Sequence, residues 1–160
     1  MNIFYLDHDP VKAASYFYDK HKVKMILESA QMLCTAHHVF NNGHNVPYKK
    51  AHLNHPSTIW VRSSVANYKW LYLHMLALGK EYTKRYGKHH LSIDKCRDAL
   101  ATPPPGLLYT DFSEPPQCMP DHYKVEGDAV SAYWNYYENE KHTVRNAGEP
   151  LIKRPCQTTN

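Results

Sequence analysis

The chain has 160 residues, of which 42% are hydrophobic and 21% are charged, and this balance excludes an intrinsically disordered protein. Its formal net charge is +4 at pH 7, but residues 1–100 carry 14 Lys and Arg against 7 Asp and Glu, whereas residues 101–160 carry 5 against 8. We therefore expect one globular domain over residues 1–160, whose basic front two-thirds suits a polyanionic partner such as nucleic acid.

The N-terminal segment combines a short apolar run with a helix start. The run NIFYL at residues 2–6 suits a brief strand or an extended arm. Asp9 followed by Pro10 is typical of a helix N-cap and first helical position. We expect a helix over residues 10–39, with a bend near Asp19.

This helix has two faces when its residues are placed at intervals of three and four. A polar face of this kind is also found on ordinary amphipathic helices, where it simply faces solvent. Its members are His21, Lys24, Glu28, Gln31, Thr35 and His38. The neighbouring apolar stripe, which we expect to face the core, consists of Val23, Ile26, Leu27, Ala30, Leu33 and Cys34.

The middle of the chain predicts a loop at residues 41–50, a helix beginning at Pro56, and a long helix that ends at Tyr86 before Gly87. Ser63 or Ser64 is expected to cap the long helix. Its apolar line is rich in aromatic residues, which we interpret as core rather than a base-stacking platform. The line comprises Val65, Tyr68, Tyr72, Met75 and Tyr82, with Leu71 and Leu78 alongside, and Trp60 and Trp70 add bulk.

The last third contains two further predicted helices, at residues 92–100 and 128–141, and an irregular tail from about residue 147. Between the helices, residues 102–120 hold six of the eleven prolines and predict a long irregular connection. We expect this connection to wrap the domain and bury Leu107, Leu108, Tyr109 and Phe112. The predicted fold is mainly α, with three or four helices packed in layers.

Common catalytic and metal-binding patterns are missing from the sequence, including phosphate-binding glycine loops and zinc-protease motifs. The His37-His38 pair and the His52-x-x-His55 pair lack a Cys or acidic partner at zinc spacing. We therefore expect neither a metal nor a cofactor. The four scattered cysteines, without a C-x-x-C pair, indicate free thiols in a cytoplasmic protein. No apolar run reaches membrane-spanning length, and the N-terminus lacks signal-peptide features.

The polar face of the first long helix suggests amine chemistry. A lysine amine can form an imine with a sugar carbon when neighbouring cations lower its pKa, and Lys24 lies close to Lys20, Lys22 and His21. Glu28, one turn further on, could hold a proton or stabilise positive charge on a ribose. The alternative is a surface ion pair between Lys24 and Glu28, worth roughly 0 to 1 kcal/mol.

Several blocks together resemble the pyrimidine-dimer DNA glycosylase family, the phage-type endonuclease V enzymes, in a divergent phage and bacterial branch. The resemblance extends over most of residues 1–140. It is carried by MNIFYLDHDP (1–10), DKHKVKMILESAQML (19–33), LNHPSTIWV (53–61), NYKWLYLHMLALGKEYTKRYGK (67–88) and MPDHYK (119–124).

The resemblance implies a compact helical protein that clamps damaged duplex DNA, flips a nucleotide, cuts its glycosyl bond through an imine and nicks the strand by β-elimination. It places the catalytic carboxylate on Glu28 and a helix-borne histidine on His21. The phage enzymes use the α-amine of a processed N-terminus as nucleophile. Asn2 is too bulky for efficient methionine removal, so the amine here would belong to Met1, or Lys24 would replace it.

The expected binding residues follow from the same interpretation. Candidates for substrate contact are His21, Gln31, His38, Asn54, His55 and Arg62. Candidates for contact with the DNA backbone are Lys22, Lys49, Lys50, Lys69 and Arg85.

Two other functions fit the sequence. The same fold could hydrolyse or sequester a free nucleotide or a nucleotide-derived signal, or it could be a non-enzymatic DNA-binding module in which Lys24 and Glu28 form only structural pairs. The sequence leaves the lesion and the oligomeric state open.

Overall fold

The computed structural model describes residues 1–156, and over that range all regular structure is helical. The mainly α prediction is confirmed; the last four residues of the expected irregular tail lie outside the described part. Three short 3₁₀ turns accompany six α-helices. These are α1 (Pro10–Ser15), α2 (Asp19–Val39), α3 (Pro56–Val61), α4 (Val65–Tyr86), α5 (Leu91–Leu100) and α6 (Ala129–Glu140).

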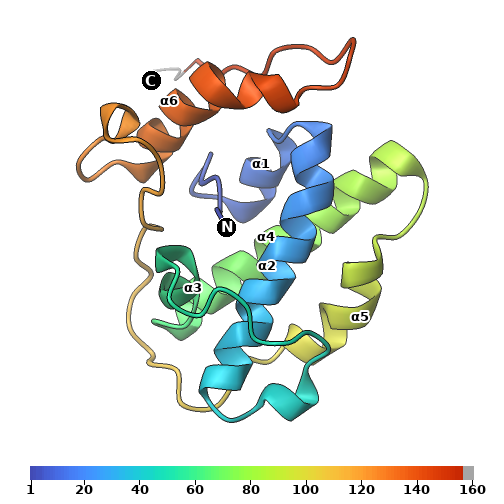
Figure 1. The fold of residues 1–160 in the computed structure, drawn as a ribbon, viewed down its shortest axis with the longest axis vertical. Coiled ribbons are helices and arrows are strands. Elements are labelled where there is room, and N and C mark those ends of the chain that lie inside the picture. Colours follow the sequence, from blue (N-terminus) through green and yellow to red (C-terminus); the bar gives the residue numbers. More distant parts are fainter. Residues whose placement is uncertain (157–160) are drawn as a thin grey trace.

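The two long helices, α2 and α4, pack against each other and form the centre of the molecule (Figure 1). Helix α1 packs on α4, and α5 packs on both long helices. Helix α6 lies across the N-terminal segment at the end of the molecule away from α5 (Figure 1). Within residues 1–156, no helix has the length and apolarity that crossing a bilayer requires.

The helix predicted over residues 10–39 is divided into α1 and α2, a stronger break than the expected bend. Tyr18 adopts an extended backbone, with ψ 150°, and its N–H donates to the hydroxyl of Tyr137 at 2.8 Å instead of to a helical carbonyl. Phe17 and Tyr18 are both buried at this break. Two large aromatic side chains thus enter the core at the interruption, where the Tyr137 hydroxyl replaces a helical carbonyl as the acceptor of the Tyr18 N–H.

Most helix starts and stops follow the sequence signals. Asp9 caps α1 with Pro10 at its first position, Ser64 caps α4, and Gly87 ends α4 in the left-handed region with φ 70°. Helices α3 and α5 have an unexpected type of cap. In each, a histidine Nδ1 accepts a backbone N–H at 3.1 Å: His55 caps α3 and His90 caps α5.

The expected apolar stripe of α2 is only partly correct. Ile26, Ala30, Leu33 and Cys34 are buried, but Val23 and Leu27 lie on the solvent side of the helix, 37% and 40% exposed. The core face is rotated toward α4 and α5, and brings in residues that the stripe omitted. These are Asp19, His21, Met25, Ser29, Met32, Thr35, Ala36 and His37, of which His21 and Thr35 were predicted to belong to the polar face.

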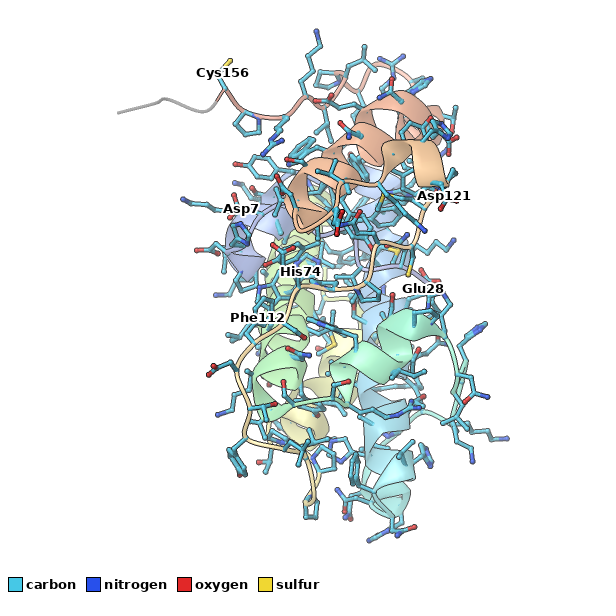
Figure 2. All side chains as sticks on the ribbon, turned by 90° about the vertical axis from the view of Figure 1, so that its left-hand side faces the viewer. Asp7, Glu28, His74, Phe112, Asp121 and Cys156 are labelled. Carbon is cyan, nitrogen blue, oxygen red and sulfur yellow. The ribbon has the colours of Figure 1, made fainter. Side chains whose placement is uncertain are left out.

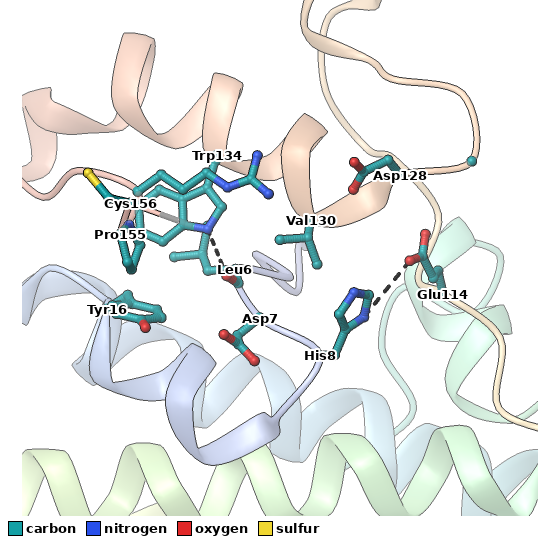
Figure 3. Close-up of a pocket in the computed structure, with 12 residues that line it drawn as sticks. Leu6, Asp7, His8, Tyr16, Glu114, Asp128, Val130, Trp134, Pro155 and Cys156 are labelled. Carbon is teal, nitrogen blue, oxygen red and sulfur yellow. Dashed lines mark hydrogen bonds and ion pairs between the residues drawn. The ribbon is translucent and has the colours of Figure 1, made fainter. Parts of the chain in front are cut away.

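The run at residues 2–6 forms a buried extended arm, with no strand partner in the described chain. Side-chain donors satisfy one carbonyl of the arm and one of the turn that follows it, as a buried backbone requires. Trp134 Nε1 donates to the Leu6 carbonyl at 2.7 Å, and Trp70 Nε1 donates to the His8 carbonyl at 2.8 Å. Figure 3 shows Trp134 of α6 above Leu6. Of the aromatic residues predicted to form the core face of α4, Tyr68 and Trp70 are buried, whereas Tyr72 and Tyr82 are partly buried and pack against the core. Trp70 also holds the N-terminal segment.

The proline-rich connection is irregular, as expected, and runs along one side of the molecule from α5 toward α6 (Figure 1). Only Leu107 of its four apolar candidates is buried; Leu108, Tyr109 and Phe112 are exposed. The prediction of burial was wrong for these three. The backbone of the connection pairs with α4 instead, since the N–H of Val65 donates to the Leu108 carbonyl at 2.8 Å.

Three histidines, His21, His37 and His74, are buried within the helical layers, and burial is the main cause that lowers the pKa of each to about 4. His74 is fully buried, and its Nε2 has no hydrogen-bond partner among the described residues. Figure 2 shows it in the interior of the molecule. These side chains are neutral in the folded protein at neutral pH.

We predict that stability falls in mild acid. Each folded-state pKa lies below the unfolded value of about 6.5, so the stabilising contribution is complete above pH 6.5 and is lost as the pH falls toward 4. At pH 5, His74 alone should reduce the free energy of unfolding by about 2 kcal/mol. Urea denaturation of wild type and His74→Phe at pH 7.5 and pH 5.0 measures this.

The pH-dependent loss should be smaller in His74→Phe by about that amount, whatever its stability at pH 7.5. His44→Gln changes an exposed histidine and should keep the wild-type pH dependence. Equal losses in wild type and His74→Phe would show that His74 does not cause the acid sensitivity.

Candidate active site

A cavity of about 310 Å³ lies where the N-terminus, the first half of α2, the start of α3 and the end of α6 meet. Its polar side chains come from segments far apart in the sequence. They include Met1, His21, Lys24, Glu28, His55 and Lys141.

The central feature of the cavity is an amine beside a carboxylate. The α-amino nitrogen of Met1 lies 3.7 Å from Glu28 Oε1. The Met1 side chain is only 1% exposed and the Glu28 side chain 17%, so the pair is largely sheltered from bulk water. Glu28 lies on the side of the molecule away from Phe112 in Figure 2. This arrangement places a potential nucleophile next to a group that can take its proton.

The Met1 side chain is part of the core. Its sulfur accepts a hydrogen bond from Thr58 Oγ1 at 3.9 Å, and it packs against the main hydrophobic cluster. Burying a methionine side chain contributes roughly 1.5 to 3 kcal/mol. Loss of Met1 would leave that space empty and would move the amine by one residue.

Asn2 fixes the direction of the N-terminus. Its side-chain amide donates to the Cys118 carbonyl at 2.9 Å, and its Oδ1 accepts the N–H groups of Ile3 at 2.7 Å and Phe4 at 3.1 Å. Phe4 is in the left-handed region, with φ 54°, which is uncommon for a bulky residue. These contacts fix the chain just after Met1, whose amine lies beside Glu28.

His21 belongs to the cavity wall and is 6% exposed. Its ring stacks on Phe4, with the ring centres 4.7 Å apart. Burial first, and then the charges of Lys141 and Lys24, lower its pKa to about 4. Its Nδ1 lies 3.1 Å from the hydroxyl of Tyr137, which also accepts the Tyr18 N–H. All groups are satisfied when Tyr137 donates to Nδ1, which leaves the proton of the neutral imidazole on Nε2.

Lys141, just after α6, supplies a second cation that the sequence analysis did not identify. Its Nζ lies 4.7 Å from the ring centre of Tyr136 and 5.8 Å from that of Phe4. Neither Lys141 nor Lys24 has an acidic partner within ion-pair distance among residues 1–156. Two aromatic faces thus hold an unneutralised ammonium group at the cavity.

The charges of the cavity do not cancel. The Met1 ammonium, Lys24 and Lys141 are positive, whereas Glu28 is the one carboxylate that lines the cavity in the described chain. The buried imidazole of His21 is neutral at pH 7. Excess positive charge in a sheltered cavity attracts an anionic group such as a phosphate.

The structure brings five of the predicted site residues into this cavity: Met1, His21, Lys24, Glu28 and His55. The remaining substrate candidates lie outside it. His38 Nε2 bonds to the Tyr48 carbonyl at 2.8 Å, and Arg62 Nη1 donates to the Leu53 carbonyl at 2.8 Å. Gln31 is half-buried one turn beyond Glu28, and Asn54 is exposed.

The predicted DNA-backbone residues fall into two groups. Lys22 is within 3.7 Å of Asp19 and 3.6 Å of Glu81, and Arg85 donates to Asp19 at 2.7 Å. Their charges are therefore largely balanced by carboxylates near the start of α2. Lys49, Lys50 and Lys69 are exposed and available for phosphate contacts.

Five cavity residues were missed because their roles depend on the fold: Phe4, Met25, Cys118, Tyr136 and Lys141. Three of them come from the last third of the chain, where the net charge is negative and no motif singles them out. Asn2 was considered only as an obstacle to methionine removal, although its hydrogen bonds orient the amine. The one signal for this role in the sequence was that Asn2 is a short polar residue directly before an apolar run.

A second cavity, of about 430 Å³, lies between the arm, α1 and α6 and holds Asp7, Glu114 and Asp128 (Figure 3). His8 Nδ1 is 4.0 Å from Glu114 at its edge. It contains no amine beside a buried carboxylate. In residues 1–156, no group of three or more His, Cys, Asp or Glu side chains is arranged to hold a metal ion.

Comparison with known proteins agrees with the N-terminal part of this site. The family model described as pyrimidine dimer DNA glycosylase matches residues 1–94. No curated protein and no solved structure matches the chain. The matched range contains Met1, His21, Lys24, Glu28 and His55, whereas Lys141 and the rest of the last third lie beyond it. Since more than half of the sequence matches, the chain belongs to the pyrimidine dimer DNA glycosylase family.

Proposed function

We propose that this protein is a DNA N-glycosylase with an associated lyase activity, and that it acts on pyrimidine dimers in duplex DNA through an imine with the α-amine of Met1. The observation that carries the proposal is the 3.7 Å separation of this amine from Glu28 in a sheltered, positively charged cavity. Membership of the family supports the substrate class.

Met1 is a better candidate nucleophile than Lys24. Lys24 is exposed on α2, and its distance to Glu28 exceeds the ion-pair range that the Met1 amine satisfies. As a class, α-amines have a pKa near 8, against about 10.4 for lysine amines, so more of them are unprotonated at neutral pH. The buried Met1 side chain and the Asn2 hydrogen bonds also hold the amine in one position.

Glu28 acts as the proton acceptor and donor of the proposed reaction. After the Met1 ammonium has lost one proton to bulk water, the neutral amine attacks C1′ of the deoxyribose, and the glycosyl bond breaks with its electron pair leaving on the pyrimidine, which takes a proton from water. Glu28 removes the proton that the new C–N bond places on the nitrogen. The carboxylate also stabilises positive charge that develops on the sugar before the bond has formed.

The lesion must leave the duplex stack to reach this cavity, so we include base flipping in the proposal. Flipping costs a few kcal/mol, and less for damaged bases that already stack poorly. The positive charges of Lys24 and Lys141 would hold the flanking phosphates, and the exposed Lys49 and Lys50 would extend that contact along the backbone. A protein that recognises the lesion through the deformability of the damaged duplex needs no side chain that reads base edges.

We predict that borohydride traps a covalent adduct between the wild-type protein and a duplex containing one pyrimidine dimer. Glu28→Gln keeps the shape of the side chain but cannot accept the proton, so the rate of trapping should fall roughly 100-fold or more. Binding to the duplex should change little. Gel analysis of trapped protein and a fluorescence binding assay measure the two effects.

Glu126→Gln is the matched control, because it changes an exposed glutamate outside the cavity and should trap at the wild-type rate. Absence of both an adduct and an abasic product with wild type would remove the proposal. A thermal shift with free nucleotides, but none with duplex, would then favour the nucleotide-binding alternative.

We further predict that Asn2→Ala impairs the chemistry more than the binding. The substitution removes the hydrogen bonds to Cys118, Ile3 and Phe4, so the amine loses its fixed direction, and mispositioning of this kind can cost about 100-fold in rate. Asn139→Ala removes an exposed side-chain hydrogen bond on α6 and serves as the control. Single-turnover trapping rates at saturating protein measure the effect, and equal rates for both variants would contradict it.

A further inference from the structure

Two imidazoles line the cavity, those of His21 and His55, and the proposed reaction uses neither. His55 lines the cavity with Met1 and Glu28, and it stands at the start of α3 in the sequence N-H-P. It is partly buried and is carried on a loop, which Arg62 fixes through the Leu53 carbonyl. The ring is therefore held in place by groups outside the cavity.

The helix cap determines which nitrogen of His55 carries the proton. Its Nδ1 accepts the backbone N–H of Ser57 at 3.1 Å, so Nδ1 must be unprotonated. A neutral imidazole then has its proton on Nε2. No hydrogen bond within residues 1–156 occupies Nε2. The cap thus leaves the Nε2–H group of this cavity-lining ring without a hydrogen-bond acceptor among the described residues.

The surroundings keep this imidazole neutral. Burial, the Met1 ammonium and His52 lower the pKa of His55, and Glu28 partly opposes them. A neutral imidazole is a poor proton donor, but it can stabilise an oxygen on which negative charge develops, by donating a hydrogen bond. The oxygen bonded to the carbon that the Met1 amine attacks is the ring oxygen O4′, and His55 shares one cavity with that amine.

We propose that His55 donates a hydrogen bond from Nε2 to the ring oxygen O4′ of the deoxyribose while the sugar ring opens, an inference that rests on the proposed function. After the base has left, C1′ is bonded to the Met1 nitrogen and to O4′. The nitrogen lone pair forms the C1′=N bond, the C1′–O4′ bond breaks, and its electron pair moves to O4′. Glu28 returns the proton it took from the amine to O4′, and His55 keeps its own proton.

This role separates two events that the family reaction normally couples. Departure of the base precedes ring opening, so it does not need the His55 donor. Formation of the imine, which borohydride traps and which leads to strand nicking, does need it. A variant without the donor should therefore release the base yet form little imine.

His55→Asn tests the inference, because asparagine is a good N-cap residue and should preserve the start of α3. With a dimer-containing duplex, alkali-labile abasic sites report base release, and borohydride trapping reports the imine. We expect base release within about threefold of wild type, whereas trapping and spontaneous nicking fall roughly 100-fold, the usual effect of removing one such donor.

His44→Asn is the matched control. His44 is an exposed histidine that does not line the cavity and is not among the groups that shift the pKa of His55. It should resemble wild type in both assays. His55→Ser provides a second cap-preserving variant if the asparagine protein is less stable.

Equal losses of base release and trapping in the His55 variants, or no loss in either assay, would overturn the inference. Both results leave the proposed function standing, provided that wild type still forms the adduct. Failure of wild type to release the base or form an adduct would instead overturn the proposed function itself.

Discussion

Burial of the N-terminal arm is the constraint on which the site depends. Residues 3–6 are almost completely inaccessible, and the Met1 side chain is 1% exposed, so the first residues of the chain are core. An extended segment without a strand partner must satisfy its backbone groups elsewhere, and indole donors from α4 and α6 do so at the Leu6 and His8 carbonyls. Because the arm cannot slide, its amine has one position, beside Glu28.

The same constraint explains why the last third of the chain matters to a site whose family match ends at residue 94. Trp134 holds the arm, the Cys118 carbonyl orients Asn2, and Lys141 adds charge to the cavity. These contacts link α6 and the irregular connection to the amine. The proline-rich connection is therefore a structural part of the site rather than a spacer, since it carries the Cys118 carbonyl to the N-terminus.

Much of the helical framework could be predicted because its signals are local. Asp9-Pro10, Ser64 and Gly87 mark helix ends through their own backbone preferences. The break at Tyr18 could not be predicted, because it depends on the Tyr137 hydroxyl, 119 residues away. The misplaced Val23 and Leu27 have a similar cause: helical periodicity defines a face, but only the positions of α4 and α5 decide where that face is centred. Glu28 and His21 were recognised from their spacing and from the family resemblance, whereas Lys141 and Asn2 gain their roles only through contacts across the fold.

The position of the proposed nucleophile is tested most directly by locating the sugar on the trapped protein. Mass spectrometry of peptides from the borohydride-reduced adduct distinguishes the Met1 α-amine from the Lys24 ε-amine, since a modified Lys24 also blocks tryptic cleavage at that residue. The account predicts an intact Met1 whose N-terminal peptide carries the deoxyribose. A deoxyribose on Lys24, or a mature protein that begins at Asn2, would contradict it.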